Sequence, residues 1–154
     1  MSIKKNGAKT KICYILPKYD PDTGSHFFHL YDLLQRASRD LDILLIVEKT
    51  AGDPRDSAIP FYCQRFSFAP LRLAEIFFIL ARERLRGRMH FYTHYSFFGA
   101  GAAWAVTTLL GGRAYYWNCG MPWLYGRPFF EESVFRFILR QSIFVTGTPG
   151  IARK

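Results

Sequence analysis

Four histidines are the side chains best suited to acid–base or metal chemistry. His94 directly follows an apolar run, where a neutral imidazole could donate a hydrogen bond to a sugar hydroxyl or merely cap the following helix. His26 and His29 stand three residues apart, but no third metal ligand accompanies them. We therefore expect no metal site. His94, together with Asn118 after a later apolar run, is the candidate for a catalytic role.

One loop has the composition of an anion-binding turn. Gly24 and Ser25 end the segment YDPDTGS and lead into a helix, whose N-terminal N–H groups could face a phosphate. A single glycine before a capped helix is also ordinary turn chemistry, so both alternatives stay open. The segment lacks the three-glycine dinucleotide fingerprint and the P-loop lysine.

Aromatic side chains gather near residue 117. Tyr115, Tyr116 and Trp117 lie in an expected strand, so alternate members must face the core. Trp123 follows in a loop held by two glycines and two prolines, GMPWLYGRP. There it could stack on a sugar ring, enter a membrane interface or simply pack within the loop.

Hydrophobic periodicity indicates the framework that must position these residues. Apolar runs expected to be strands cover 11–16, 42–48, 59–66, 89–93, 113–118 and 143–146. Helical patterns cover 26–39, a segment opened by Pro70, 95–110 and 131–141. Such alternation predicts a doubly wound, Rossmann-like α/β fold, with a parallel sheet of about six strands and helices on both faces. Ligands bind outside the carboxyl ends of such strands, where the candidate residues lie.

Length and cysteine content limit the domain count and the compartment. With 154 residues, of which 49% are hydrophobic, the chain can bury one sizeable core but not two. We expect a flexible basic N-terminus over 1–10 and one Rossmann-like domain over 11–154. Three widely spaced cysteines without a C-x-x-C pair argue against a disulfide framework and a zinc site. No apolar stretch long enough for a signal peptide opens the chain, so a cytoplasmic protein is expected.

The formal net charge of +9 arises mainly from lysines before residue 20 and from an arginine cluster. A solvated surface, anionic lipid headgroups, a diphosphate ligand and nucleic acid would each fit that charge. Nucleic acid is the partner we expect least, because the aromatics sit in apolar runs and no recognition motif occurs.

Phe77, Phe78 and Ile79 cannot all face the sheet. They precede four basic residues, Arg82, Arg84, Arg86 and Arg88.

This combination predicts peripheral association with an anionic membrane, at its inner face; plain solvation of the arginines is the alternative. A second segment imitates a membrane span, because no charged residue occurs from Tyr95 to Gly112. Its small and hydroxylated residues favour a helix packed on the sheet instead.

Four sequence stretches place the chain beside a known family. They are KICYILPKYDPDTGSHFFHLYDLL from Lys11, HYSFFGAG from His94, YYWNCGMPW from Tyr115 and VTGTPGIA from Val145. In order and position they resemble the N-terminal domain of family 4-type glycosyltransferases of the GT-B fold. In that family the first strand leads through a glycine-rich turn into a helix, and the later stretches fall at its later strand ends. The resemblance spans nearly the whole chain.

The resemblance implies the acceptor-side half of a hexosyltransferase that uses a nucleotide sugar and no other cofactor. The turn at Gly24 and Ser25 would approach the donor diphosphate. A glycan or lipid-linked acceptor would contact the cleft residues His26, Tyr95, Cys119, Gly120, Trp123 and Thr148. The family commonly has two glycines in the turn and a histidine ending the fifth strand. Here Ser25 replaces one glycine, and Asn118 or Cys119 replaces the histidine.

The donor-binding domain of that family, which carries its E-x7-E motif, is not matched by any of the four stretches. We therefore expect an enzyme that is incomplete alone, either because it is truncated or because a C-terminal donor domain on another chain completes it. A non-catalytic Rossmann-like binding or partner module is the alternative from a different functional class.

Overall fold

The computed structural model describes residues 9–20, 28–50, 59–117, 126 and 128–145. Within these ranges, strands and helices alternate much as the sequence predicts. The elements in chain order are β1 Thr10–Leu16, α1 Phe28–Ala37, β2 Leu41–Val47, β3 Phe61–Cys63, α2 Ala69–Leu85, β4 His90–His94, α3 Phe97–Leu110, β5 Arg113–Trp117, α4 Phe129–Gln141 and β6 Ile143–Val145.

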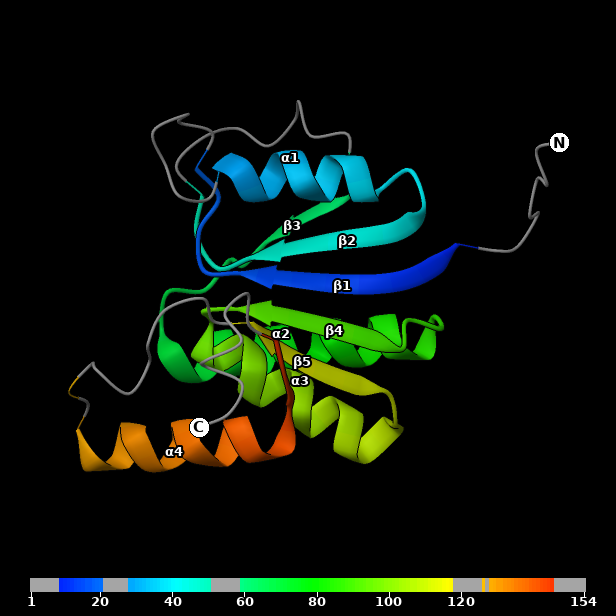
Figure 1. Cartoon of the computed structure of the whole chain (residues 1–154). Coiled ribbons are helices and arrows are strands. Elements are labelled where there is room, and N and C mark those ends of the chain that lie inside the picture. Colours follow the sequence, from blue (N-terminus) through cyan, green and yellow to red (C-terminus); the bar gives the residue numbers. More distant parts are fainter. Residues whose placement is uncertain (1–8, 21–27, 51–58, 118–125, 127, 146–154) are drawn as a thin grey trace, which may run out of the picture.

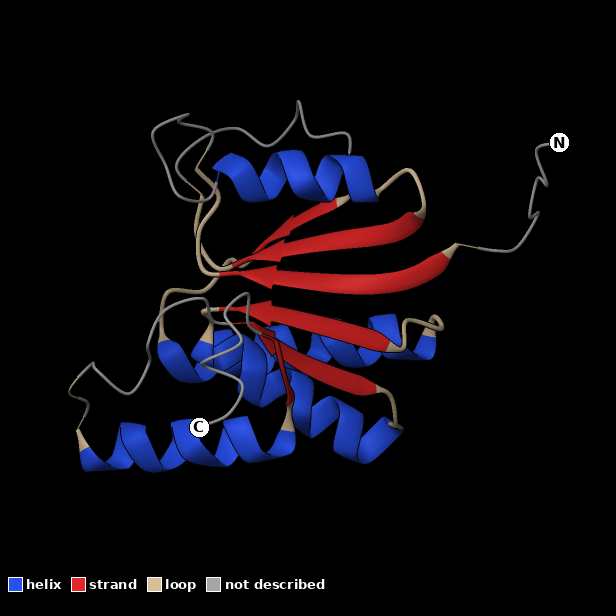
Figure 2. Cartoon of the chain, in the orientation of Figure 1, coloured by secondary structure: helices blue, strands red, loops and turns tan. Residues whose placement is uncertain are grey.

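All six of these strands are parallel and follow the order β3-β2-β1-β4-β5-β6. The chain starts at the centre with β1, moves outward to β3, and then returns to the other side of β1 as β4. Right-handed crossovers consequently place α1 on one face of the sheet and α2, α3 and α4 on the other (Figures 1 and 2). The predicted doubly wound α/β fold is confirmed.

The continuously apolar strands are buried from both sides, as parallel strands require. Successive residues of β1 point to opposite faces, so Cys13 and Ile15 pack under α2 and α3 while Tyr14 and Leu16 pack under α1. On the α1 side, Leu30 and Leu34 cover the sheet. Other side chains fill the opposite layer, namely Ile76, Ile79, Leu80, Phe91, Ala103 and Val106.

The charge-free segment forms a helix packed on the sheet, as predicted. Ser96 caps α3 by accepting a hydrogen bond from the Gly99 N–H at 2.8 Å. The inner side of α3 is made of small buried residues, among them Ala100, Ala102 and Ala103. In the ranges that the structure describes, no helix has the length and apolar character needed to cross a bilayer.

The arginine cluster at the end of α2 is only partly a surface feature, contrary to the expectation of four exposed cations. Arg88 is buried, with an exposed fraction of 8%. Its guanidinium donates to the carboxylates of Glu83 and Asp42, at 3.2 and 2.9 Å, and to the Ile12 carbonyl oxygen at 3.0 Å. Arg88 therefore joins α2 to the first two strands, and Arg82, Arg84 and Arg86 remain as the cluster's surface cations.

Candidate functional site

The strand order reverses between β1 and β4, so the crevice outside their carboxyl ends is the place where doubly wound sheets bind ligands. Figure 1 shows the arrowheads of all strands at one edge, beside the first turns of α2 and α3. Three segments meet there: the residues after β1, Glu48 after β2, and the turn from β4 into α3. This carboxyl edge is the candidate site.

His94 is the last residue of β4, and its side chain is 2% exposed. The Tyr14 hydroxyl lies 3.2 Å from His94 Nδ1, so the imidazole is tied to the neighbouring central strand. The rings of Tyr95 and Trp117 lie 4.4 and 4.8 Å from it. From the sequence, His94 is expected either to donate to a sugar hydroxyl at the mouth of the cleft or to cap the next helix. The structure instead buries His94 in an aromatic cage and gives the cap to Ser96.

Tyr95 has a left-handed backbone, with φ of 56°, which L-residues with large side chains rarely adopt. Its N–H donates to the Trp117 carbonyl oxygen at 3.4 Å, which fixes the turn to the end of β5. A strained backbone of this kind persists only where the surrounding structure holds it, and it is found preferentially at functional sites. Of the site residues predicted from sequence, the consecutive pair His94 and Tyr95 lies in the described part of the carboxyl edge.

A buried polar network holds the start of α3. The Glu48 carboxylate accepts from the Ser96 hydroxyl through one oxygen and from the Arg72 guanidinium through the other. Arg72 also lies over the Phe98 ring, with 5.2 Å between its Cζ and the ring centroid. The side chains of Arg72 and Glu48 are 12% and 10% exposed, so their pairing fixes geometry rather than presenting charge.

Gly99 allows the start of α3 to approach the centre of the sheet. A Cβ at this position would lie 2.6 Å from Cγ2 of Ile15 and 2.8 Å from the Ser96 hydroxyl. Any larger residue would push α3 away from β1. The glycine therefore sets how closely the Tyr95 turn stands to the end of the first strand.

An aromatic ladder crosses the α1 side of the sheet. Tyr14, Tyr92 and Tyr115 stack in turn, with ring centroids 6.3 and 4.3 Å apart and near-parallel planes. Beside them lies a hollow of about 390 Å³, which Trp117 and Leu33 also line. The prediction that alternate aromatics are core is confirmed, because Tyr116 is 3% exposed and packs under α4.

Burial keeps the proton on a tyrosine of the aromatic ladder and on a cysteine of the opposite layer. Burial, followed by the neighbouring Tyr115, raises the pKa of Tyr92, so its hydroxyl keeps its proton at neutral pH. Burial likewise raises the pKa of the Cys13 thiol to about 12. In the described part of the chain, no group of three side chains suited to metal binding occurs.

The remaining predicted site residues lie outside the described ranges and stay predictions: Gly24, Ser25, His26, Asn118, Cys119, Gly120, Trp123 and Thr148. Sequence reasoning missed Tyr14, Arg72 and Ser96. Ser96 had a readable signal, since a serine before a helical run is a typical cap. Arg72 had no such signal in the sequence, because only the packing of α2 against the sheet shows that this arginine is buried beside Glu48.

Several solved structures share this fold. A Listeria monocytogenes protein assigned as a UDP-N-acetylglucosamine 2-epimerase aligns with a TM-score of 0.66 and 12% identity, covering 95% of this chain and 41% of that one. MnaA of S. aureus, solved with UDP, aligns with a TM-score of 0.61 and 14% identity, covering 93% of this chain and 39% of that one. Anabaena HepE, solved with UDP and glucose, aligns with a TM-score of 0.56 and 12% identity, covering 86% of this chain and 35% of that one.

At such identities the likeness shows the fold alone, that of a GT-B-like Rossmann domain. This chain spans about two fifths of the length of those proteins. No protein-family model matches the chain, and no curated protein matches it.

Proposed function

We propose that this chain is the N-terminal, acceptor-side domain of a GT-B glycosyltransferase of the family 4 type. It would help to move a hexose from a nucleotide sugar to a lipid-linked or polysaccharide acceptor in the cytoplasm. The observation that carries the proposal is the turn at the β1–β4 switch point. There, a tethered His94 and a left-handed Tyr95 lead into the capped start of α3.

The described residues suit an acceptor sugar. Partly exposed phenol groups supply hydrogen-bond partners for hydroxyl groups, and flat aromatic rings supply apolar contact for a pyranose face. The Glu48–Ser96–Arg72 network keeps the turn in place without contributing a net charge of its own. The roles are therefore divided: the partly exposed Tyr95 contacts the ligand, the buried His94 supports that turn from within, and the network positions the start of α3.

The donor side rests on the resemblance and on the fold. Two solved structures of this fold hold UDP, one of them together with glucose, which agrees with a nucleotide sugar as donor. In the proposal, the turn at Gly24 and Ser25 approaches the donor diphosphate, and no other cofactor is needed. More than half of each of those proteins has no counterpart in these residues. We therefore place the donor-binding domain outside them, on the same polypeptide or on another.

Transfer and binding assays on the 154-residue chain test the proposal together. The purified chain is incubated with UDP- and GDP-hexoses and a mixed pool of glycan and lipid-linked acceptors. We expect no transfer, because only one wall of the cleft is present, but measurable binding of octyl β-glucoside as an acceptor probe. Robust transfer by the chain alone would show that the donor site is misplaced. Failure to bind any acceptor would favour the non-catalytic partner module.

A further inference from the structure

The outer surface of the α2–α3–α4 layer exposes unusually many large apolar side chains. Phe78 and Leu85 on α2 are 70% and 78% exposed, Leu109 on α3 is 69% exposed, and Phe137 on α4 is 42% exposed. No charged residue occurs in α3. Isolated exposed apolar residues are ordinary, but a surface that carries them on three adjacent helices marks an interaction site.

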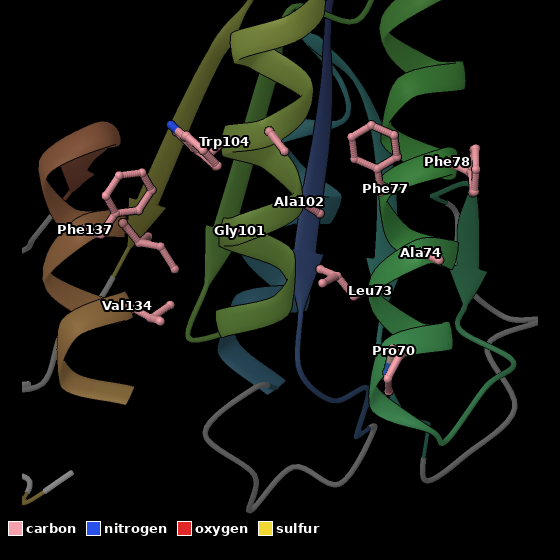
Figure 3. A pocket seen from close by; sticks show the side chains of 12 residues that line it. Pro70, Leu73, Ala74, Phe77, Phe78, Gly101, Ala102, Trp104, Val134 and Phe137 are labelled. Atoms are coloured by element: carbon pink, nitrogen blue, oxygen red, sulfur yellow. The ribbon is translucent and has the colours of Figure 1, made fainter. Parts of the chain in front are cut away.

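The three helices also enclose an apolar hollow of about 590 Å³ on this surface. Figure 3 shows Trp104 and Phe137 facing each other between α3 and α4, with Phe77 and Phe78 on α2. The rings of Trp104 and Phe137 meet edge to face with centroids 4.8 Å apart. The lining thus presents aromatic rings and aliphatic side chains, without charged residues.

Cations gather where these helices end. Arg82, Arg84 and Arg86 close α2, and the Lys11 ammonium donates to the Arg86 carbonyl oxygen at 3.4 Å, so Lys11 joins the cluster. Glu83, the acidic residue among these arginines, is buried and already shared by Arg82, Arg86 and Arg88. The cluster therefore keeps a net positive charge.

Two further cations extend this charge toward α4. Arg113 at the start of β5 and Arg140 in the last turn of α4 are exposed. In the ranges described, neither forms an ion pair. Arg113 borders a polar hollow of about 230 Å³ with Thr107, Thr108 and Gln141. Trp104 lines both this polar hollow and the apolar one, so an apolar and an anion-attracting region adjoin.

We propose that this helical surface docks on a bilayer containing anionic lipid. Apolar area to insert and cations to attract the headgroups are the two parts that interfacial binding needs. The helices would lie along the surface, with Phe78, Leu109 and Phe137 entering it and Arg113 and Arg140 meeting phosphates. The proposal goes beyond the proposed function, because it does not involve the carboxyl edge of the sheet.

Vesicle flotation with the full chain tests it. The chain should float with phosphatidylcholine vesicles containing phosphatidylglycerol at low salt, and should be released as ionic strength rises. Phe78→Ser and the double variant Arg113→Gln/Arg140→Gln should each reduce the apparent affinity by about fivefold or more. Circular dichroism verifies that each variant is folded; both alter exposed side chains.

Matched controls come from α1, on the opposite side of the sheet, and from Arg39 in the turn that follows it. Leu33→Ser removes a half-exposed apolar residue, and Arg36→Gln/Arg39→Gln removes two exposed positive charges. Both should bind as the unaltered chain does. Equal flotation with neutral vesicles, no flotation with either type, or equal losses in the α1 controls would overturn the proposal. So would self-association in sedimentation that Phe78→Ser abolishes while vesicle binding stays unchanged.

Discussion

The Tyr14 hydroxyl lies 3.2 Å from Nδ1 of His94, and this contact joins the two central strands at the point where the strand order reverses. Both side chains are buried on the α1 side of the sheet. The contact fixes the direction of the imidazole without placing a charge beside it. The turn that follows His94 therefore depends on Tyr14 for its position.

Tyr14→Phe should therefore weaken binding of octyl β-glucoside several-fold, because the ring stays but the imidazole loses its tether. Stability should fall by only about 1 kcal/mol, the net value of one hydrogen bond. Isothermal titration and thermal unfolding measure the two effects. Tyr92→Phe is the control, since its hydroxyl belongs to the same ladder but does not tether His94. An equal loss of affinity in both variants would contradict the assignment. His94→Ala is less informative, because it also removes buried packing.

Gly99→Ala should destabilise the fold by about 1–3 kcal/mol, because the added methyl group collides with Ile15 and Ser96. Gly101→Ala provides a control within the same helix, since a Cβ there meets nothing within 4 Å. That change should stabilise the protein by about 0.5–1 kcal/mol, through helix propensity. Urea denaturation measures both free energies of unfolding. Equal effects in the two variants would show that α3 does not approach β1 this closely.

Arg88→Gln should destabilise the protein by about 1.5–3 kcal/mol, because the buried carboxylate of Glu83 loses its inner partner while Arg82 and Arg86 remain. The matched change Arg82→Gln alters a side chain that is 53% exposed and should cost less than about 1 kcal/mol. Chemical denaturation compares them. If Arg82→Gln proves the more damaging, then Arg88 does not organise this cluster.

Alkaline pH should lower the free energy of unfolding. The Cys13 thiol has an ordinary pKa of 9.0 and a folded pKa of about 12. Between these values the unfolded chain releases a proton that the folded chain retains, so stability falls as pH rises, by at most about 1.4 kcal/mol per pH unit. Cys13→Ala should flatten this slope in urea titrations from pH 8 to 11. An unchanged slope would mean that Cys13 is not the responsible group.

The sequence predicted the layout of the domain well, because parallel strands buried on both faces leave an unmistakable apolar signature. The run at 42–48 and the alternation of Tyr115, Tyr116 and Trp117 are examples; both behave in the structure as expected. The third strand was predicted too long, because β3 covers only Phe61–Cys63. Pro60 precedes it: its carbonyl oxygen accepts from the Leu45 N–H at 2.9 Å, but the proline ring leaves no N–H to donate to the ladder.

The site was less predictable, because its geometry depends on contacts between distant residues. Arg88 looked like its exposed neighbours in sequence, and only the approach of Asp42 and Ile12 shows that it is buried. Likewise, Tyr14 and His94 are 80 residues apart, and nothing in their local sequence indicates that they meet. Position after a strand identifies which residues can serve a ligand, but not how each is oriented.

The most direct test of the central claim is to map ligand contacts on the isotopically labelled 154-residue chain by NMR. Octyl β-glucoside, kept below its micelle-forming concentration, and UDP-glucose are titrated separately, and backbone amide shifts are followed. Glucoside shifts should concentrate at the carboxyl edge, at Tyr95, Ser96 and the residues after β1. Shifts confined to the opposite edge, around Arg86 and Gly112, or no shifts with either compound, would contradict the assignment of this chain as the acceptor-side domain of a glycosyltransferase.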